Sequence, residues 1–483
     1  PEEMAAIVAS PSSQRRSMAL AAGGTALLLL GAWWVFDGPG TASIQATLDP
    51  EAPVESIAVL PFADMSPDGD QGYFGDGLAE ELLDALAKVE GLVVAARTSS
   101  FRFRGQDVDI AEVADRLGVK TVLEGSVRSG GDRVRITAQL VNADGFHLWS
   151  ESYDRSIGEM KDLIRVQEEI AQSIVAALSL APDKAAGGAP ETLIVQGTDN
   201  LEAYNALLRG RHLMEQRSPL SMTAAAEQLE RAIELDPDYP RAWANLSMTT
   251  TMLIAYTGGD SAIEARGKEA AERALELDPL LAEAHAASGY RSWIIDSDFE
   301  SADQSFARAI ELDPRLSTAW KWRGELVAGL GGDPDAGVPY SEKAVELDPL
   351  SLIALRDLAK VYDDAGRYRD ADSVMASLLE LEPDFPPAIM DLAPRAERAG
   401  DLAAATAYVE HYVELTGLQQ PHRLTRLYWM AGDDDESVRQ FRSVVPSDTS
   451  AVPEWMLSSM NEFLHSLNRT EGPGAVGAFV VAQ

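Results

Sequence analysis

The six residues AIELDP occupy positions 232–237 and recur without change at 309–314. Close variants stand at 274–279 (ALELDP), 344–349 (AVELDP) and 378–383 (LLELEP). In chain order, the shared leucine advances by 42, 35, 35 and 34 residues. A spacing near 34 residues with two helices per unit is typical of stacked helical hairpins, whose apolar stripes cover one another. The proline ends the second helix of each unit, because it disfavours the helical conformation of the residue before it.

Other positions recur with the same spacing. Small residues stand where two helices must approach closely, namely Ala274, Ala309 and Ala344. Large residues stand where a side chain must fill the space between helices, namely Trp243, Phe306, Trp320 and Tyr362. With the period and the proline, they resemble the tetratricopeptide repeat family over residues 198–440. The resemblance implies an all-α superhelix with a groove for a protein or peptide partner. By spacing along the first helix of each pair, we select Asn245, Lys321 and Arg356 as candidate groove residues. The 42-residue step holds an insertion at 257–267, which we interpret as a longer loop or an extended helix.

An uncharged segment, MALAAGGTALLLLGAWWVF, occupies residues 18–36, close to the roughly 20 residues that cross a bilayer as a helix. Two arginines precede it, and two tryptophans lie near its far end, where interfacial aromatics belong. We predict a retained transmembrane helix, with a cleaved signal peptide and a buried core helix as the alternatives. The positive-inside rule places residues 1–17 in the cytoplasm and the later domains in the periplasm, on a bacterial inner membrane. A first residue of Pro1 instead of methionine is compatible with a missing upstream cytoplasmic domain.

The composition excludes several kinds of chemistry. The chain has 483 residues, no cysteine and a formal net charge of −37. Disulfides, thiolate metal sites and cysteine nucleophiles are therefore excluded. A surface this acidic repels phosphate backbones, so we expect no nucleic acid partner for the folded parts. The acidity serves either solubility or an acidic docking face, and the sequence does not indicate the oligomeric state.

Residues 55–180 follow a different pattern from the repeats. Their apolar periodicity predicts strands at 56–62, 92–96, 119–128, 133–141 and 146–155, and helices at 72–89, 109–118 and 160–178. We expect Asp76 to cap the helix at 72–89, with Glu80 and Glu81 in its favourable first turn. Two strand–helix units followed by three antiparallel strands form an α+β layout, with one mixed sheet under helices.

Four segments of this region resemble a known family of domains. The phrases IAVLPFADMSPDGDQGYFGDGLAEEL, VVAARTSSFRFRG, LGVKTVLEGSVRSGGDRVRITAQLV and GFHLWSESYDR resemble the N-terminal-domain-like module of TolB and its FlgO and CsgG relatives. The resemblance implies an envelope-located, non-catalytic interaction domain. It also implies an architecture in which a cytoplasmic domain, one membrane span, this module and tetratricopeptide repeats follow one another. In such chains the cytoplasmic domain is an adenylyl cyclase, a winged-helix regulator or a protein kinase.

The sequence offers no complete constellation for catalysis. GYFGDG at 72–77 lacks the Gly-Lys-Ser/Thr ending of a phosphate-binding loop, and no G-x-S-x-G elbow frames Ser99 or Ser100. The histidines are dispersed, without the spacing of a metal site. We therefore predict no catalytic, cofactor-binding or metal-binding residue. Arg102 and Arg104 belong to a basic-aromatic string, which we interpret as an anion-binding or partner-docking loop or as a strand edge with solvated arginines.

The remaining boundaries complete the predicted organisation. Linkers are expected at 37–54 and 181–197, capping helices at 441–470 and a disordered tail at 471–483. Asp199 and Glu202 are assigned to a capping box at the first repeat helix. We expect a membrane-anchored periplasmic protein-binding scaffold or sensor without catalysis in this chain. The alternatives are a regulatory ectodomain of a cyclase, kinase or transcriptional regulator, and an envelope assembly or secretion factor.

Overall fold

The computed structural model describes residues 55–178, apart from 107 and 131–132, and residues 197–440, apart from 259–260, 331–332, 434–435 and 438. The predicted transmembrane helix, the cytoplasmic stub, both linkers almost entirely, the capping helices and the tail lie outside these residues. Among the helices that are described, none combines the length and apolar character needed to cross a bilayer. Below, "module" means residues 55–178 and "array" means residues 197–440.

The module contains the predicted mixed sheet. Its strands are β1 (Glu55–Val59), β2 (Ala63–Asp64), β3 (Leu92–Val94), β4 (Thr121–Gly130), β5 (Arg133–Asn142) and β6 (His147–Ser156). The order is β3-β1-β4-β5-β6, with β2 beside β4. The pairs β3–β1, β1–β4 and β2–β4 are parallel, whereas β4–β5 and β5–β6 are antiparallel. The sequence-based layout of parallel strands followed by a meander is therefore confirmed.

Helices cover both faces of this sheet. They are α2 (Gly72–Leu86), α3 (Arg97–Phe101), α4 (Ile110–Leu117) and α5 (Met160–Ala177). Side chains alternate along a strand, so Ile57 and Val59 pack with α2 and α5 while Ala58 packs on the opposite face with α4. The predicted helix at 109–118 is confirmed, with Asp109 as its cap and Gly118 closing it at a φ of 65°.

Two predicted helix caps are wrong. Asp76 lies inside α2 and is buried, and the N-cap position belongs to Gln71, which makes no side-chain capping bond. At the first repeat helix, the side chain of Asn200 accepts from the backbone N–H groups of Glu202 and Ala203, so Asn200 and not Asp199 is the cap. Asp76 is instead paired with side chains far away in the sequence. Asp199 is replaced as the cap by the residue that follows it.

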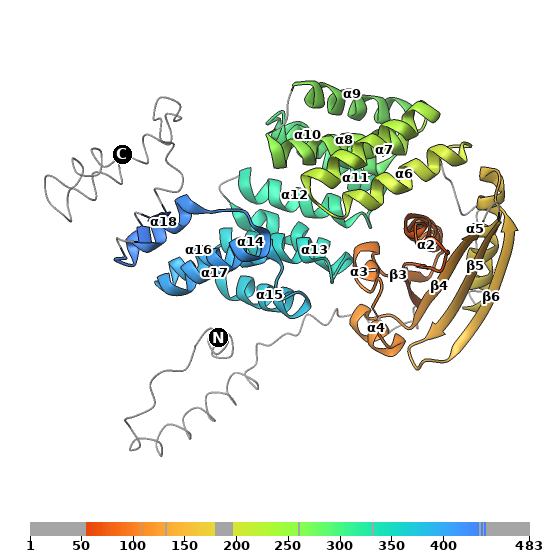
Figure 1. The fold of residues 1–483 in the computed structure, drawn as a ribbon, viewed down its shortest axis with the longest axis horizontal. Helices are drawn as coiled ribbons and strands as arrows, with labels where there is room; N and C mark the ends of the chain where they lie inside the picture. The colour runs from red at the N-terminus through yellow and green to blue at the C-terminus, as the bar shows by residue number, and fades with distance from the viewer. Residues whose placement is uncertain are drawn as a thin grey trace, which may run out of the picture. The chain divides into compact units, whose positions relative to one another are not determined.

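The array consists of antiparallel helix pairs that follow one another along the chain (Figure 1). The first helices of the pairs are α6 (Leu201–Met214), α8 (Pro240–Thr257), α10 (Ala282–Ile294), α12 (Ser317–Leu330), α14 (Leu352–Asp364), α16 (Pro386–Arg398) and α18 (Pro421–Met430). The second helices are α7 (Pro219–Leu235), α9 (Ser261–Leu277), α11 (Phe299–Leu312), α13 (Val338–Leu347) preceded by the 3-10 turn η2 (Pro334–Gly337), α15 (Tyr368–Leu381) and α17 (Leu402–Thr416). First helices also pack on the next first helix, as α8 does on α10 and α12 on α14. This stacking confirms the predicted superhelix of repeats.

The AIELDP stretches end helices, as their proline predicts. The helices α7, α9, α11, α13 and α15 all end at the leucine that precedes the Asp-Pro or Glu-Pro pair. The small positions Ala274, Ala309 and Ala344 are buried where helices meet. The 42-residue step is accommodated by longer helices, since α8 has 18 residues and α9 has 17, against 14 in α11 and α12.

A side chain six residues beyond the proline fixes the turn. The Nε1–H groups of Trp243 and Trp320 donate to the carbonyl oxygens of Pro237 and Pro314 at 2.8 and 2.9 Å. In the intervening repeat, Nε2 of His285 lies 2.9 Å from the carbonyl oxygen of the corresponding proline. In these three repeats, the ring therefore ties the start of the new first helix to the end of the previous pair.

Candidate functional site at the junction of module and array

Helix α2 carries buried carboxylates on the side that faces the array. Asp76, Glu80 and Glu81 lie four and five residues apart, so they share one side of the helix. Their exposed fractions are only 6%, 4% and 4%. Between them Gly77 lets α6 approach, because a Cβ atom there would lie 2.3 Å from Cδ1 of Leu208. Leu208 is part of the module core, so the first array helix completes that core.

Basic side chains of the array form ion pairs or hydrogen bonds with these carboxylates. Arg211 pairs with Glu80, and Nδ1 of His212 lies 2.8 Å from Oδ2 of Asp76. From α8, Arg241 pairs with Glu81 at 2.8 Å, and both side chains are almost fully buried. A buried ion pair brings little net stability, but removing one partner is costly because the other charge stays unpaired in the interior. These pairs therefore favour one docked arrangement of module and array, because any other arrangement would leave buried charges unpaired.

Helix α3 adds a second set of pairs around Glu215, at the end of α6. Arg104 lies 2.9 Å from a carboxylate oxygen of Asp76 and 3.0 Å from one of Glu215. Arg97 pairs with Glu215 as well, and its Nε lies 3.0 Å from Glu80. Burial raises the pKa of Glu215, but the guanidinium groups of Arg97 and Arg104 outweigh it and hold that pKa below its usual value. Glu215 is thus a fixed anion of the junction.

The hydrogen bond that His212 donates to Asp76 also affects the pKa of His212. That bond favours the protonated imidazole and raises the pKa of His212, whereas partial burial opposes the rise. The junction therefore contains a histidine that can change charge near neutral pH.

Ser99 of α3 forms hydrogen bonds with the turn that follows α13. In the turns after α7, α9 and α11, the carboxylate of the Asp-Pro pair accepts from the backbone N–H two residues later, at 3.1, 2.9 and 3.0 Å. In the turn after α13, Ser99 occupies this place. Its Oγ donates to Asp348 at 2.5 Å and accepts from the N–H of Leu350 at 2.9 Å, while its own N–H donates to Asp348 at 3.0 Å. Burial raises the pKa of the Asp348 carboxyl, and the hydrogen bonds from Ser99 oppose that rise.

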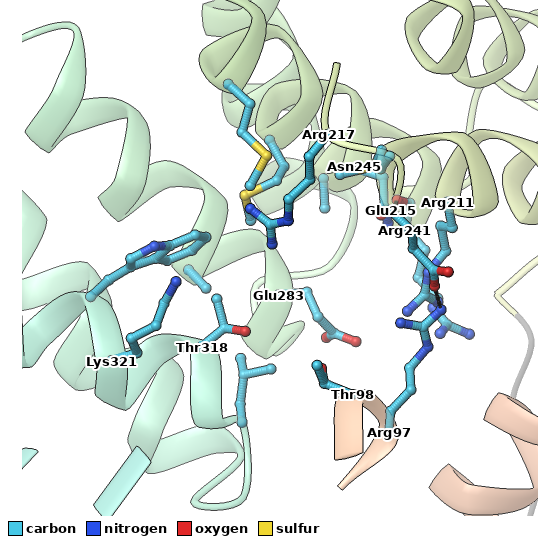
Figure 2. A pocket seen from close by; sticks show the side chains of 17 residues that line it. Arg97, Thr98, Arg211, Glu215, Arg217, Arg241, Asn245, Glu283, Thr318 and Lys321 are labelled. Carbon is cyan, nitrogen blue, oxygen red and sulfur yellow. Dashed lines mark hydrogen bonds and ion pairs between the residues drawn. The ribbon is translucent and has the colours of Figure 1, made fainter. Parts of the chain in front are cut away.

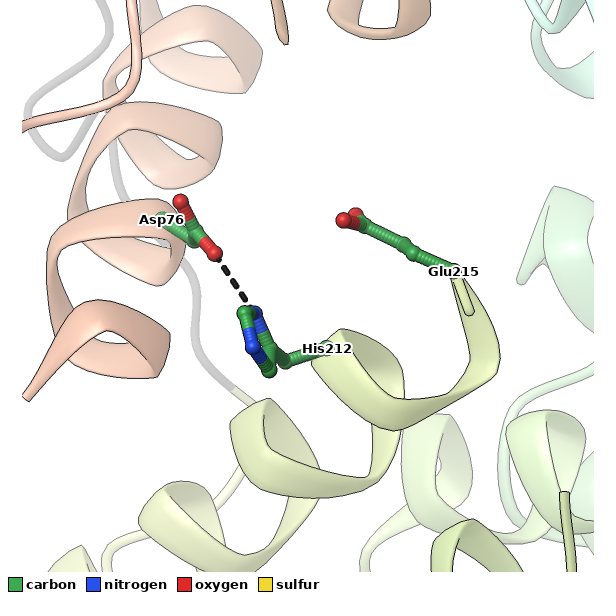
Figure 3. A group of neighbouring side chains, drawn as sticks. All are labelled: Asp76, His212 and Glu215. Carbon is green, nitrogen blue, oxygen red and sulfur yellow. Dashed lines mark hydrogen bonds and ion pairs between the residues drawn. The ribbon is translucent and has the colours of Figure 1, made fainter. Parts of the chain in front are cut away.

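Asp76, His212 and Glu215 come close enough for their side-chain atoms to surround a metal ion (Figure 3). Both carboxylates already contact Arg104, and Glu215 also contacts Arg97. A divalent cation at this point would face two guanidinium charges and would have to displace them. The arrangement is therefore better satisfied as an ion-pair network than as a metal centre.

A cavity of about 260 Å³ opens next to this network (Figure 2). Its walls come from α3 of the module and from the first helices α6, α8, α10 and α12, with the loop after α6. The lining combines charged groups with methionine and tryptophan side chains. Seven of the seventeen lining residues are charged, so this cavity is more polar than the mainly apolar pockets that usually hold small molecules.

The three candidate groove residues selected from the sequence do not all lie at the cavity. Asn245 and Lys321 line the cavity, and Nδ2 of Asn245 donates to the carbonyl oxygen of Arg241 at 2.8 Å. Arg356 does not line it, and its Nε lies 2.6 Å from Asp391 on the neighbouring first helix. All three lie on first helices, as their selection assumed.

The basic-aromatic string forms α3 and the turn after it, so its interpretation as a strand edge is wrong. Arg102 donates to the carbonyl oxygen of Leu381 at 3.1 Å, and Arg104 contacts Asp76 and Glu215. Both arginines thus contact parts of the same chain, and a role toward an outside partner stays a prediction.

Sequence reasoning missed the acidic side of α2 and the special role of Asp348. One signal for the first was available: three acids and a glycine share one side of a helix whose other positions, apart from Asp84, carry no charge. No signal for the second exists in the sequence, because Asp348 stands in the same motif as its counterparts.

Comparison with known proteins gives partial matches. The family "HilA/YgeH-like transcriptional regulator, second domain" matches residues 53–173, which are the module. The curated "Putative adenylate cyclase 3" of Rhizobium meliloti (strain 1021) is 40% identical over 242 residues, which are 49% of this chain and 40% of that protein. The chain thus spans less than half the length of this relative. The resemblance of the module to TolB stays a prediction.

Several solved structures are similar in the arrangement of their helices. The type IV pilus biogenesis factor PilW is 19% identical, with a TM-score of 0.38 over 45% of this chain and 98% of PilW. The human IFIT1 dimer with PPP-AAAA is 14% identical, with a TM-score of 0.46 over 63% of this chain and 71% of IFIT1. Pseudomonas aeruginosa pilF is 16% identical, with a TM-score of 0.34 over 50% and 99%. At these scores the likenesses decide nothing about this chain, whose repeat fold is assigned from its own helices.

Proposed function

We propose that this chain is a regulatory scaffold: the array binds a protein partner on the face formed by its first helices, and the module, which contacts the array from α6 to the end of α15, reports that binding. The observation behind the proposal is the stack of helix pairs, since a continuous face of repeated helices suits an extended peptide or a partner helix. The junction supports the second half, because its ion pairs and the Ser99–Asp348 contact transmit a shift of the array to the module.

Site-specific crosslinking tests the binding face. Lys360 on α14 is exposed and lies on the same helix as Arg356, one turn further on. A photoreactive amino acid at position 360 should give a discrete crosslinked species in the native host. The matched control is position 272, an exposed glutamate on the second helix α9. Equal yields at both positions, or none at 360, would contradict a binding face on the first helices.

A second candidate is the regulatory part of a nucleotide cyclase. The 242-residue match with a protein named a putative adenylate cyclase favours it, and the match of the module to a transcriptional-regulator family extends the idea to other effectors. In this proposal, any catalysis belongs to a domain outside the present sequence. The reading frame upstream of Pro1, together with cyclic AMP levels in cells with and without the gene, tests it. An upstream frame without an effector domain would leave the scaffold as the whole function.

For the location, we propose anchoring in a bacterial inner membrane through residues 18–36, with module and array in the periplasm. The uncharged segment and the arginines before it support this orientation. Fusion of alkaline phosphatase after residue 185 should be active, and fusion of green fluorescent protein at the same point should be dark. The reverse pattern would place the later domains in the cytoplasm.

A further inference from the structure

Three charged side chains around the cavity have weak partners or none. The side chains of Arg217 and Glu283 form no hydrogen bond or ion pair with any described residue. Lys321 lies 3.5 Å from Asp357, which is longer than the 2.7–2.9 Å typical of strong charge-assisted bonds. By contrast, Arg97, Arg211 and Arg241 on the module side are paired with buried carboxylates.

Arg217 is placed there by an uncommon backbone conformation. Its φ of 48° lies in the left-handed region, which residues other than glycine seldom adopt. It stands just beyond the end of α6, and its guanidinium group points into the cavity in Figure 2. Such outliers concentrate at functional sites, where the surroundings hold them in place.

One wall of the cavity is apolar and adaptable. Met248 and Met252 of α8 and Trp322 of α12 contribute to it, and Trp322 is buried. Methionine side chains adjust to differently shaped apolar groups and make favourable contacts with aromatic rings. An apolar group of moderate size can therefore lie between the methionines and the tryptophan.

The volume limits the size of the occupant. Pockets for drug-sized ligands usually measure about 300–1,000 Å³, and this cavity of about 260 Å³ lies just below that range. It has room for a molecule the size of an amino acid, but not for a helix or a peptide of several residues.

We propose that this cavity binds a free α-amino acid with an apolar side chain. Arg217 and Lys321 hold its carboxylate, Glu283 holds its ammonium group, and Met248 and Trp322 contact its side chain. Each of the three poorly paired charges then gains a partner of opposite sign, which neither a simple anion nor a simple cation would provide. This inference does not depend on the proposed protein partner, because the cavity is only a small part of the first-helix face and its ligand is tested by itself.

Binding would also tighten the junction. Arg97 and Thr98 belong to the module, while the other lining residues belong to the array. A ligand that contacts both parts stabilises their docked arrangement over a separated one, to the extent that it binds the docked form more tightly.

Calorimetry and thermal unfolding of the full chain test the proposal with matched probes. L-phenylalanine and L-leucine should bind saturably and raise the melting temperature. Phenethylamine, which lacks the carboxylate, and 3-phenylpropanoate, which lacks the ammonium group, should each bind about tenfold more weakly or worse, because each leaves a charge unpaired. No saturable binding of either amino acid in the millimolar range, or equal binding of all probes, would overturn the proposal.

Charge-removing variants then assign the roles. Arg217→Gln combined with Lys321→Gln should abolish the preference for phenylalanine over phenethylamine, and Glu283→Gln the preference over 3-phenylpropanoate. Arg231→Gln is the control, since Arg231 is exposed on α7 and, within the described part of the chain, pairs only with Glu234. Circular dichroism melts without ligand establish that each variant folds. Preferences that survive in both cavity variants would show that the amino acid binds elsewhere.

Discussion

Replacing Ser99 by alanine isolates the contact that joins α3 to the turn after α13. The hydroxyl group is fully buried and donates to Asp348 at 2.5 Å while it accepts from the N–H of Leu350 at 2.9 Å. Its loss leaves one buried donor unpaired and takes a hydrogen bond from a buried carboxylate, and each such loss costs about 1–3 kcal/mol. The backbone N–H of Ser99 still donates to Asp348, and the N–H of Leu350 can turn to Asp348 as its counterparts do in three other turns. We therefore expect the free energy of unfolding to fall by about 1–2 kcal/mol, toward the lower end of the range.

Ser100 is the matched control. It has the same side chain and is equally buried, and its Oγ has no hydrogen-bond partner among the residues that the structure describes. Ser100→Ala should therefore leave the free energy of unfolding unchanged or raise it slightly. Urea unfolding of the full chain, followed by circular dichroism, measures both variants. Equal losses in Ser99→Ala and Ser100→Ala would refute the assignment, because only packing and not the hydrogen bonds would then matter.

The loss of stability caused by Ser99→Ala should depend on pH. Burial raises the pKa of Asp348, and the hydrogen bonds from Ser99 oppose that rise, so loss of the hydroxyl bond raises the pKa further. An acid whose pKa is higher in the folded state destabilises the protein once the pH exceeds its unfolded value of about 3.9. The cost of Ser99→Ala should thus be larger at pH 7 than at pH 4, where a protonated Asp348 needs less support. A cost independent of pH would contradict this role of the carboxylate.

The junction makes three further predictions. Arg241→Met should lower the free energy of unfolding by about 3–5 kcal/mol, because it leaves Glu81 buried and unpaired. Adding Glu81→Gln should restore part of this loss in urea titrations, and a double variant as unstable as the sum would contradict the pairing. The pKa of His212 is raised by its hydrogen bond to a carboxylate, so its contribution to stability is complete below the unfolded pKa of about 6.5 and is lost as the pH rises through the folded pKa. Melting temperatures should therefore fall across this window in the native chain and less so in His212→Gln; parallel profiles would exclude the effect. Gly77→Ala should cost about 1–3 kcal/mol by forcing α6 away, whereas Gly72→Ala, with nothing within 4 Å of the new Cβ, should be neutral in the same melts.

The repeats could be predicted from the sequence because their determinants are local. The proline of each Asp-Pro or Glu-Pro pair ends a helix by constraining the residue before it, and in three repeats the ring six residues later reaches back to that proline. The alternation of Ile57, Ala58 and Val59 likewise shows which side chains share a face, before any partner helix is known. Such signals need no knowledge of distant parts of the chain.

The junction could not be predicted, because its determinants lie far apart in the sequence. Asp76 near a helix start satisfies the local rule for a cap, yet its partners are His212, 136 residues later, and Arg104. Asp348 stands in a motif that is nearly identical to those of Asp236 and Asp313, and only the docking of Ser99 distinguishes it. Asn245 and Lys321 were selected by spacing and do line the cavity, but the contribution of α3 to its wall follows from tertiary structure alone.

Burial determines which influences can act on the junction. Exposed ion pairs such as Arg133–Asp154 are screened by salt, with a Debye length of about 8 Å at physiological ionic strength. The pairs of Arg241 and Arg211 with α2 are screened much less, because their carboxylate partners are buried. Separation of module and array would also expose Leu208 and the apolar surface that it covers, which opposes opening at any salt concentration. Changes in ionic strength should therefore leave the two parts docked. Protonation of His212 and occupation of the cavity act inside the junction itself, and these are the influences through which the chain can couple its array to its module.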